Sequence, residues 1–396
     1  MSTRFREFAL PLVGILLLAI NLRPAITAVG PIITEVGEDL SLSSSELGLL
    51  GALPIATFGA VSAFVQIFIQ RFGVERVTVA ALLVLTGATV LRSWPGPNAN
   101  LWIGTILIGA AIAVGNVAVP VFVKRSFPRQ VATITGVYVA VLGICAGLAA
   151  AFAVPIAAAS PLGWRLALGV WALLTVVALI HWSLKSASAP RSYGGSSTPL
   201  GERRVQIWRS RVAWQLSVYM GAQGSVFYIC LTWLPAVEQH LGYPPAVTGW
   251  HMFGLQVTGV IGNLLAPQLM KVGPDERLAT VIPGLASLIS VLGFFWLPEA
   301  ALVWVFIFGL GTGTSFVVSL SLIATRAETL TVAGQLSAMT QGVGYTITAA
   351  LLFSSGIAYG KNPIGVLAII GVAAIIVAAA GLAAGRSRTV SAPIGG

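Results

Sequence analysis

Charged residues are scarce in this chain. Of its 396 residues only 9% are Asp, Glu, Lys or Arg, while 57% are hydrophobic. A soluble domain carries roughly 25% charged residues, so too little polar surface is present to cover a fold in water. We therefore expect the chain to be embedded in a lipid bilayer.

Cysteine and histidine are nearly as rare. The two cysteines, Cys145 and Cys230, lie inside apolar runs and are interpreted as small packing residues, which excludes a disulfide framework. The three histidines have no acid beside them within an apolar run, and no His, Cys, Asp and Glu cluster has metal-ligand spacing. No phosphate-binding GxxxxGK[ST] loop occurs. We therefore expect no enzyme, no catalytic residues, no cofactor and no metal.

Long apolar runs make up most of the chain instead. A run of about 20 apolar residues can cross a bilayer as a helix, and lipid admits only helices or closed barrels. These runs are too long for barrel strands, so they predict an all-α membrane protein, and the first run is interpreted as an uncleaved span. The twelve predicted spans are roughly 9–34, 45–69, 77–93, 100–123, 131–158, 165–184, 212–236, 246–270, 278–297, 300–324, 332–358 and 363–384.

The basic residues fall mainly on one side of these spans. Of the 22 Lys and Arg residues, only Arg92, Arg165 and Lys361 lie in the predicted outer segments, and Arg23 lies within a span. All the others lie in the segments predicted to be inside. This positive-inside pattern predicts that both termini are cytoplasmic. It also indicates that the basic charge contacts anionic lipid and not nucleic acid.

The chain is predicted to consist of two related halves. A stretch rich in Ser, Gly, Pro and Arg separates the sixth span from the seventh. It predicts an N-terminal six-helix half at 1–186, a flexible cytoplasmic linker at 187–210 and a C-terminal six-helix half at 211–396.

Two loops repeat one another in the halves. The sequence RFGVER follows the second span, from Arg71 to Arg76, and KVGPDER follows the eighth, from Lys271 to Arg277. Internal duplication is typical of secondary transporters. We predict that Arg71, Arg76, Lys271 and Arg277 tie helix ends together on the cytoplasmic face and act in gating.

Polar side chains are concentrated in spans one, four, seven, eight, ten and eleven. Spans three, six, nine and twelve have few, and a polar side chain facing lipid loses its hydrogen bonds. The polar spans are therefore predicted to line an interior. The residues predicted to contact a substrate are Asn21, Arg23, Asn116, Gln223, Tyr228, Gln341 and Tyr345. The alternative is that these side chains only join neighbouring helices.

Arg23 is the most costly of these residues. It stands about fourteen residues into the first span, roughly 21 Å along a helix in a core about 30 Å thick. An arginine at that depth costs at least about 2.5 kcal/mol. Pro24 follows it and predicts a kink with free carbonyls beside the cation. Arg23 is interpreted as part of a site for an anion or a nitro group, and a purely structural role is the alternative.

Acidic residues are expected to be absent from the spans. All 12 fall near span ends or in loops, whereas an embedded carboxylate is a common proton carrier in antiporters. His251 is therefore predicted as a proton-coupling residue. The alternatives are a histidine with no transport role, a proton carried by the substrate itself, and loop-edge acids such as Glu35 and Glu46.

Several stretches resemble a known family. The GWR at residues 163–165 and the RFGVER loop resemble the major facilitator superfamily, although RFGVER lacks the aspartate and second basic pair of the full loop signature. A closer resemblance, to the cyanate porter family, rests on NLRPAITAVGP (21–31), GNVAVPVFVKRSFP (115–128), AWQLSVYMGAQGSVFYICLTWLP (213–235) and LSAMTQGVGY (336–345). It implies twelve helices in two six-helix pseudo-repeats and a proton-motive-force-dependent carrier of the plasma (inner) membrane.

These observations lead to one functional hypothesis with two alternatives. The hypothesis is a secondary active transporter that moves a small anion, or a small nitro- or cyanate-like solute, by alternating access. The alternatives are an exporter of a neutral hydrophobic drug and a non-transporting membrane receptor or scaffold. The expected partners are a small-molecule substrate and the lipid bilayer, and we expect a monomer.

Overall fold

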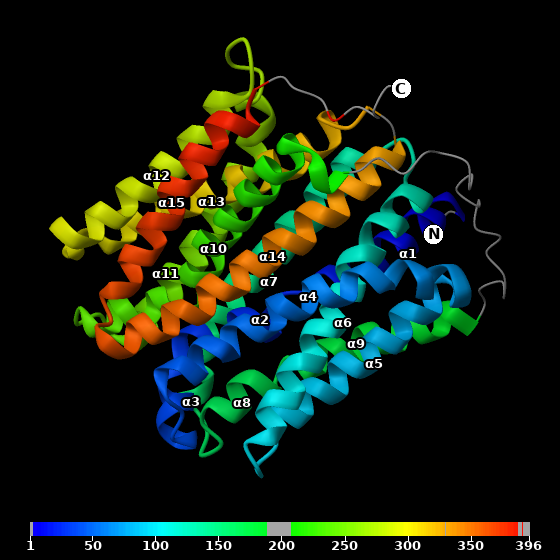
Figure 1. Cartoon of the computed structure of the whole chain (residues 1–396). Helices are drawn as coiled ribbons and strands as arrows, with labels where there is room; N and C mark the ends of the chain where they lie inside the picture. Colours follow the sequence, from blue (N-terminus) through cyan, green and yellow to red (C-terminus); the bar gives the residue numbers. More distant parts are fainter. Residues whose placement is uncertain (1–2, 188–206, 329, 387–389, 391–396) are drawn as a thin grey trace. The chain divides into compact units, whose positions relative to one another are not determined.

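Helices account for almost all of the structure. The computed structural model describes residues 3–187, 207–328, 330–386 and 390 (Figure 1). The only β-type pairing among these residues is an isolated bridge between Ala327 and Val390. The prediction of an all-α membrane protein is confirmed. Most of the predicted linker, residues 188–206, lies outside the described part.

The helices follow the predicted spans closely. Up to residue 187 they are α1 (Thr3–Ala19), α2 (Pro24–Thr27), the 3-10 turn η1 (Gly30–Ile32), α3 (Ile33–Leu40), α4 (Ser44–Phe72), α5 (Val74–Ser93), α6 (Ala99–Ser126), α7 (Val131–Ala158), α8 (Trp164–Gly169) and α9 (Ala172–Ala187). After the linker come η2 (Ile207–Arg209), α10 (Arg211–His240), α11 (Pro245–Leu269), α12 (Arg277–Trp296), η3 (Pro298–Ala300), α13 (Ala301–Thr325), α14 (Leu330–Lys361) and α15 (Gly365–Ala384).

Eleven helical segments of the described chain are long and apolar enough to cross a membrane. The remaining predicted span corresponds to α11, which is 25 residues long but more polar, since it carries His251, Gln256 and Asn263. The total of twelve spans and the cytoplasmic position of the termini stay predictions.

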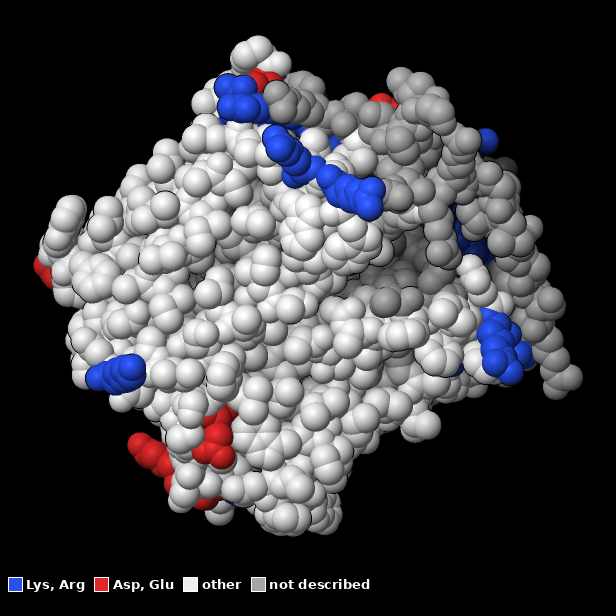
Figure 2. Space-filling view, viewed as in Figure 1, with Lys and Arg blue, Asp and Glu red and all other residues white. Residues whose placement is uncertain are grey.

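The outer surface matches this membrane setting. In Figure 2 the visible face is almost entirely free of charge, and the Lys, Arg, Asp and Glu side chains are confined to its margins. Large apolar side chains remain exposed along the spans, for example Leu83 on α5 and Leu173 on α9. In water such a surface would aggregate, whereas in a bilayer it faces lipid.

The chain forms two compact units. The first comprises Met1–Leu42, Ala56–Gly195 and Pro244–Phe253, and the second comprises the remaining segments, Ser43–Ile55, Ser196–Tyr243 and Gly254–Gly396. Each unit therefore includes the first turns of one helix, α4 or α11, whose remainder belongs to the other unit.

In the first unit α5 packs along α6 and α9, and α1 contacts α6, α7 and α9. Figure 1 shows α5, α6 and α9 side by side. Helix α5 directs Leu82, Leu85 and Ala88 into this packing, whereas Leu83 and Val84 stay exposed. Spacings of three residues place the buried set on one face of the helix.

In the second unit α10 is the central helix. It packs against α13, α14 and α15, and α12 packs against α13 and α15. Helices α11 and α13 approach one another closely, because a Cβ at Gly313 would collide with the backbone of Gly259. The glycines of GLGTGTS, residues 309–315, thus serve helix packing, as small residues do in membrane helices.

Each unit contains an ion pair that joins the start of one helix to the end of the next helix. Glu75 at the start of α5 binds Arg125 at the end of α6, with an O–N distance of 2.6 Å. Glu276, the N-cap residue of α12, binds Arg326, the C-cap residue of α13, also at 2.6 Å. The partners are 50 residues apart in both pairs. Each acid lies at a helix N-terminus and each arginine at a C-terminus, where the helix dipoles favour them.

The two pairs differ in which member is buried. In the first, the Glu75 side chain is 4% exposed and that of Arg125 is 45% exposed. In the second, the Arg326 side chain is 5% exposed and that of Glu276 is 22% exposed. Removing one member of a buried pair is destabilising because the other is left as an uncompensated charge.

We therefore predict opposite asymmetries in the two units. Arg125→Gln should lower the melting temperature more than Glu75→Gln, because it removes a cationic partner from the buried Glu75 carboxylate, at about 3 kcal/mol. Glu276→Gln should lower it more than Arg326→Gln for the same reason. Thermal unfolding of the four purified variants tests this. Equal losses for both members of a pair would contradict the assignment of the buried partner.

Candidate functional site

The first span is interrupted where Arg23 and Pro24 stand. Helix α1 ends at Ala19 and α2 begins at Pro24. The amides of Asn21 and Leu22 bond the carbonyls of residues three positions earlier, at 3.1 and 3.2 Å, so the helix tightens and then stops. Pro24 has no N–H with which to continue the α-helical ladder. The predicted irregularity beside the cation is confirmed as a complete break.

Three neighbouring helices hold the break in place. The Asn21 side-chain amide donates to the carbonyl of Leu17 at 2.7 Å and to that of Leu174 on α9 at 3.3 Å. The hydroxyl of Thr27 donates to the carbonyl of Ala146 on α7 at 2.8 Å. Leu22 lies so close to Gly115 on α6 that any side chain at Gly115 would displace it. The segment is thus fixed against α6, α7 and α9.

Arg23 sits within this fixed segment and is half-buried. Its carbonyl accepts hydrogen bonds from the amides of Ile26 and Thr27 at 2.9 and 3.0 Å, so its backbone forms the start of α2. Asn116 on α6 is also half-buried and directly follows Gly115, the glycine against which the break packs. The structure therefore brings Arg23 and Asn116 to the same region of the first unit, whereas the Asn21 amide is directed to backbone carbonyls.

The sequence did not indicate that Arg92 is buried. Arg92 was assigned to an outer segment, but it lies inside α5 and is only 2% exposed. Its Nη1 donates to the carbonyl of Ala25 at 2.7 Å. That carbonyl is left over by the short helix α2, because the amide of Val29 bonds Ile26 instead. The Nε and Nη2 atoms of Arg92 have no partner among the described residues.

Arg92 thus completes the support of the broken span, from α5. Arg92 stands near the end of an apolar run, and the sequence alone does not show at which residue the helix ends. Its burial inside α5 was therefore not predicted. Helix α6 accommodates the side chain with a glycine, since a Cβ at Gly104 would collide with that of Arg92.

In the second unit the predicted residues lie on α10 and α14, which pack together. A Cβ at Gly344 of α14 would contact Met220 and Gly221 of α10, and the Thr348 hydroxyl donates to the carbonyl of Gly221 at 3.1 Å. Gln341 and Tyr345 are one helical turn apart on α14, so they share a face, and both are half-buried.

Gln223 faces the interior of the second unit. It is 4% exposed, its amide contacts the sulfur of Met220 at 3.3 Å, and it lines a small pocket with Ser287, Thr312 and Ser315 of α12 and α13. Tyr228 is buried five residues further along α10, edge-on to Phe227 with ring centroids 5.0 Å apart. Substrate contact by these residues stays a prediction.

The four predicted gating residues differ in their surroundings. Arg71 and Lys271 are exposed, and Arg76 is half-buried. Arg277 pairs with Asp275 at 3.2 Å. The ion pairs that join helix ends in these regions are made by other residues, Glu75 with Arg125 and Glu276 with Arg326. The repeated loops RFGVER and KVGPDER contain the two glutamates of these ion pairs. Their arginine partners lie 50 residues further along the chain, where no local sequence pattern indicates them.

One of the acids expected near a span end is deeply buried. Glu238 lies in the last turn of α10, which ends at His240, and is fully buried. The sequence placed it at a span end but did not show its burial. His251 on α11 is also buried. The described residues contain no group of three potential metal ligands.

These features define a class of protein, the polytopic helical transporters built from two related units. The profile of the Major Facilitator Superfamily matches residues 15–351. The chain belongs to this family.

Relatives of known name support a narrower placement. The chain is 33% identical over 379 residues, 95% of each sequence, to the 2-nitroimidazole transporter of Escherichia coli (strain K12). It is 29% identical over 349 residues, 87% of this chain and 89% of the relative, to the cyanate transport protein CynX of the same organism. The resemblance to the cyanate porter family is therefore confirmed. The chain is an integral membrane protein with a small-molecule substrate, and it is not an enzyme.

Solved structures show the same fold. A bacterial homologue of the human lysosomal transporter Spinster, in an inward-facing and unoccupied conformation, superposes with a TM-score of 0.77 over 98% of both chains, at 14% sequence identity. At this identity the likeness concerns the fold alone.

The role of Arg92 leads to a prediction. Arg92→Met removes a costly buried charge and also leaves the Ala25 carbonyl without its donor, and each effect is worth about 2–3 kcal/mol with opposite sign. The melting temperature should therefore change little. Transport should fall about tenfold, because the segment that holds Arg23 loses a support.

Arg92→Lys keeps one donor that can reach the carbonyl and should restore part of the transport. Arg165→Met, at an arginine that pairs with Asp39 at 2.7 Å, is the control and should transport normally. Melting temperature and proteoliposome uptake are measured together. Wild-type uptake by a folded Arg92→Met variant would show that the break does not need this support.

Proposed function

We propose that the protein is a secondary active transporter of the plasma (inner) membrane that moves a small anion, or a small nitro- or cyanate-like solute, by alternating access. The two halves would rock about a site near the middle of the membrane, as in other carriers built from repeats. The observation that carries the proposal is Arg23, a permanent cation in an interrupted span.

The surroundings of Arg23 favour a ligand-binding role. Asn21, Thr27, Leu22 and Arg92 fix the broken segment through backbone hydrogen bonds and packing. A side chain on a fixed segment is pre-organised, so little conformational entropy is lost when it binds a ligand. A guanidinium offers planar paired donors, which match the oxygens of a carboxylate or a nitro group.

The relatives agree with this substrate class. One is named for 2-nitroimidazole and another for cyanate. A nitro group and a cyanate ion are both small and rich in electrons, so a single cationic site suits both. Asn116 in the first unit and Tyr228, Gln341 and Tyr345 in the second are the proposed polar contacts that complete the recognition.

Two substitutions at Arg23 test the proposal. If the substrate is anionic, Arg23→Gln should insert and fold normally, since loss of the charge relieves its burial, and binding should fall by at least tenfold. Arg23→Lys should retain only part of the affinity, because it keeps the charge without the two-point contact. Ligand-induced thermal shift and uptake are compared with wild type, with Arg165→Gln as a control.

The outcomes separate the alternatives. Full transport by a folded Arg23→Gln variant, without competition from small anions, would favour an exporter of neutral hydrophobic drugs. A joint loss of expression and melting temperature in both variants, with binding intact in the protein that survives, would assign Arg23 a structural role. Absence of any potential-dependent flux in proteoliposomes would favour a receptor or scaffold.

Proton coupling is proposed for Glu238 and His251. Glu238 is fully buried and His251 is nearly so, and buried titratable side chains within membrane helices commonly carry protons in transporters. Glu238→Gln and His251→Gln should each reduce uptake driven by a pH gradient while leaving substrate exchange at equal pH intact. A variant that loses both kinds of uptake equally would instead implicate its residue in substrate binding.

A further inference from the structure

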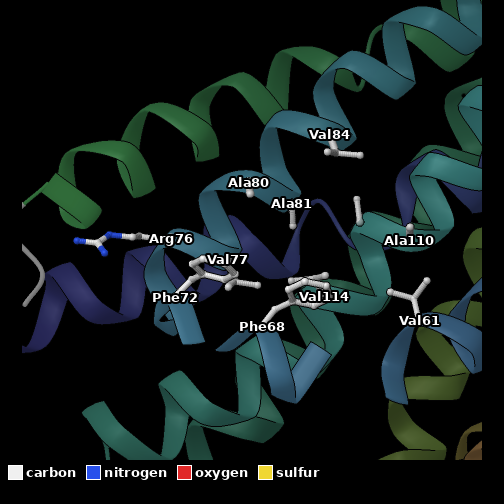
Figure 3. Close-up of a pocket in the computed structure, with 11 residues that line it drawn as sticks. Val61, Phe68, Phe72, Arg76, Val77, Ala80, Ala81, Val84, Ala110 and Val114 are labelled. Carbon is white, nitrogen blue, oxygen red and sulfur yellow. The ribbon is translucent and has the colours of Figure 1, made fainter. Parts of the chain in front are cut away.

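An apolar groove runs along the first unit between α4, α5 and α6. It has a volume of about 490 Å³, within the size range of small-ligand sites. Figure 3 shows Phe68 and Phe72 of α4, Ala81 and Val84 of α5, and Val114 of α6 around it. Arg76 is the one charged residue of its lining.

Residue size explains why the groove exists. Ala80 and Ala81 on α5 and Ala110 on α6 line it with side chains too short to fill the space between the helices. Phe68 and Phe72, which are 50% and 48% exposed, stand at its side. The groove is therefore a furrow in the apolar surface of the spans, where the surrounding solvent is lipid.

Positive charge lies at one end of this groove: Arg76 is part of its lining, and the guanidinium carbon of Arg71 lies 5.3 Å from the centroid of the lining Phe72 ring. In Figure 3 the side chain of Arg76 extends away from the alanines, beyond the start of α5. This end of α5 also carries the Glu75–Arg125 ion pair. Glu75 is already bound to Arg125, and Arg76 has no hydrogen bond or ion pair within the part of the chain that the structure describes.

The second unit provides an internal comparison. A groove of about 480 Å³ lies between α11, α12 and α13, and Leu269, Ile282 and Gly311 are among the residues that line it. Its lining contains no Lys or Arg. Arg277, which follows Glu276 as Arg76 follows Glu75, pairs with Asp275 at 3.2 Å. The two grooves are alike in size, but only the first has a charged residue in its lining.

We propose that the groove between α4, α5 and α6 binds one acyl chain of an anionic phospholipid, whose phosphate accepts hydrogen bonds from Arg76. An acyl chain matches the apolar lining of the furrow, and the guanidinium matches a phosphate in charge and geometry. The positive-inside pattern predicts that this end faces the cytoplasmic leaflet, which is the anionic one.

The headgroup, not the chain, sets the preference for one lipid over another. An acyl chain that enters the groove leaves one apolar environment for another, so it gains little from the hydrophobic effect. One arginine near an anionic surface strengthens binding about fivefold. We therefore expect about a fivefold preference for an anionic lipid over a zwitterionic one in the first groove, and none in the second.

Native mass spectrometry of the delipidated protein tests this with dioleoyl phosphatidylglycerol and dioleoyl phosphatidylcholine. Wild type should bind the first lipid about fivefold more tightly than the second. Arg76→Gln should abolish that preference, and Arg277→Gln, the matched control from the second unit, should keep it. Ala81→Leu, which fills the groove and leaves Arg76 in place, should weaken both lipids.

Three outcomes would overturn the proposal: equal affinity of wild type for the two lipids, an undiminished preference in Arg76→Gln, or an equal loss in Arg277→Gln. If Ala81→Leu does not fold, the comparison of Arg76 with Arg277 still decides. Because no substrate is used, the result is independent of the transport function proposed above.

Discussion

The demand that every backbone polar group be satisfied without water governs this structure. An unbroken helix meets the demand by itself, but a break inside the membrane leaves carbonyls that must find other donors. The first span breaks between Ala19 and Pro24, and its neighbours supply what is missing. Arg92 donates to the Ala25 carbonyl, whereas Asn21 and Thr27 of the broken segment donate to carbonyls of α9 and α7 and so anchor the segment.

This constraint divides the buried polar groups between two tasks. Asn21, Thr27 and Arg92 contact backbone carbonyls, so their hydrogen bonds hold the fold. Arg23 lies in the segment that they fix, and its charge is not required by the geometry of the break, which Pro24 already imposes. The proposed function assigns that charge to the substrate, and the supporting residues then act as its scaffold.

The two units show which features of the repeat are retained and which diverge. Both carry an ion pair from a helix start to the end of the next helix, and both have an apolar furrow of similar volume. They differ where function is proposed. Counted from the glutamate of the ion pair, the position of Arg92 on α5 corresponds to Gly293 on α12. The space at Gly293 is occupied by the ring of Trp304. The first span is broken, whereas α10 is continuous.

The sequence by itself determined the all-helical membrane class, the positions of the spans, the break at Arg23 and Pro24, and the family, because hydropathy, proline and local motifs act over short stretches of chain. Tertiary structure decided which polar residues face which partners. It buried Arg92 and Glu238, turned Gln223 toward α12 and α13, and joined Glu75 to an arginine 50 residues away. These outcomes depend on how helices pack, and contacts between distant segments leave no periodic signal in a single sequence.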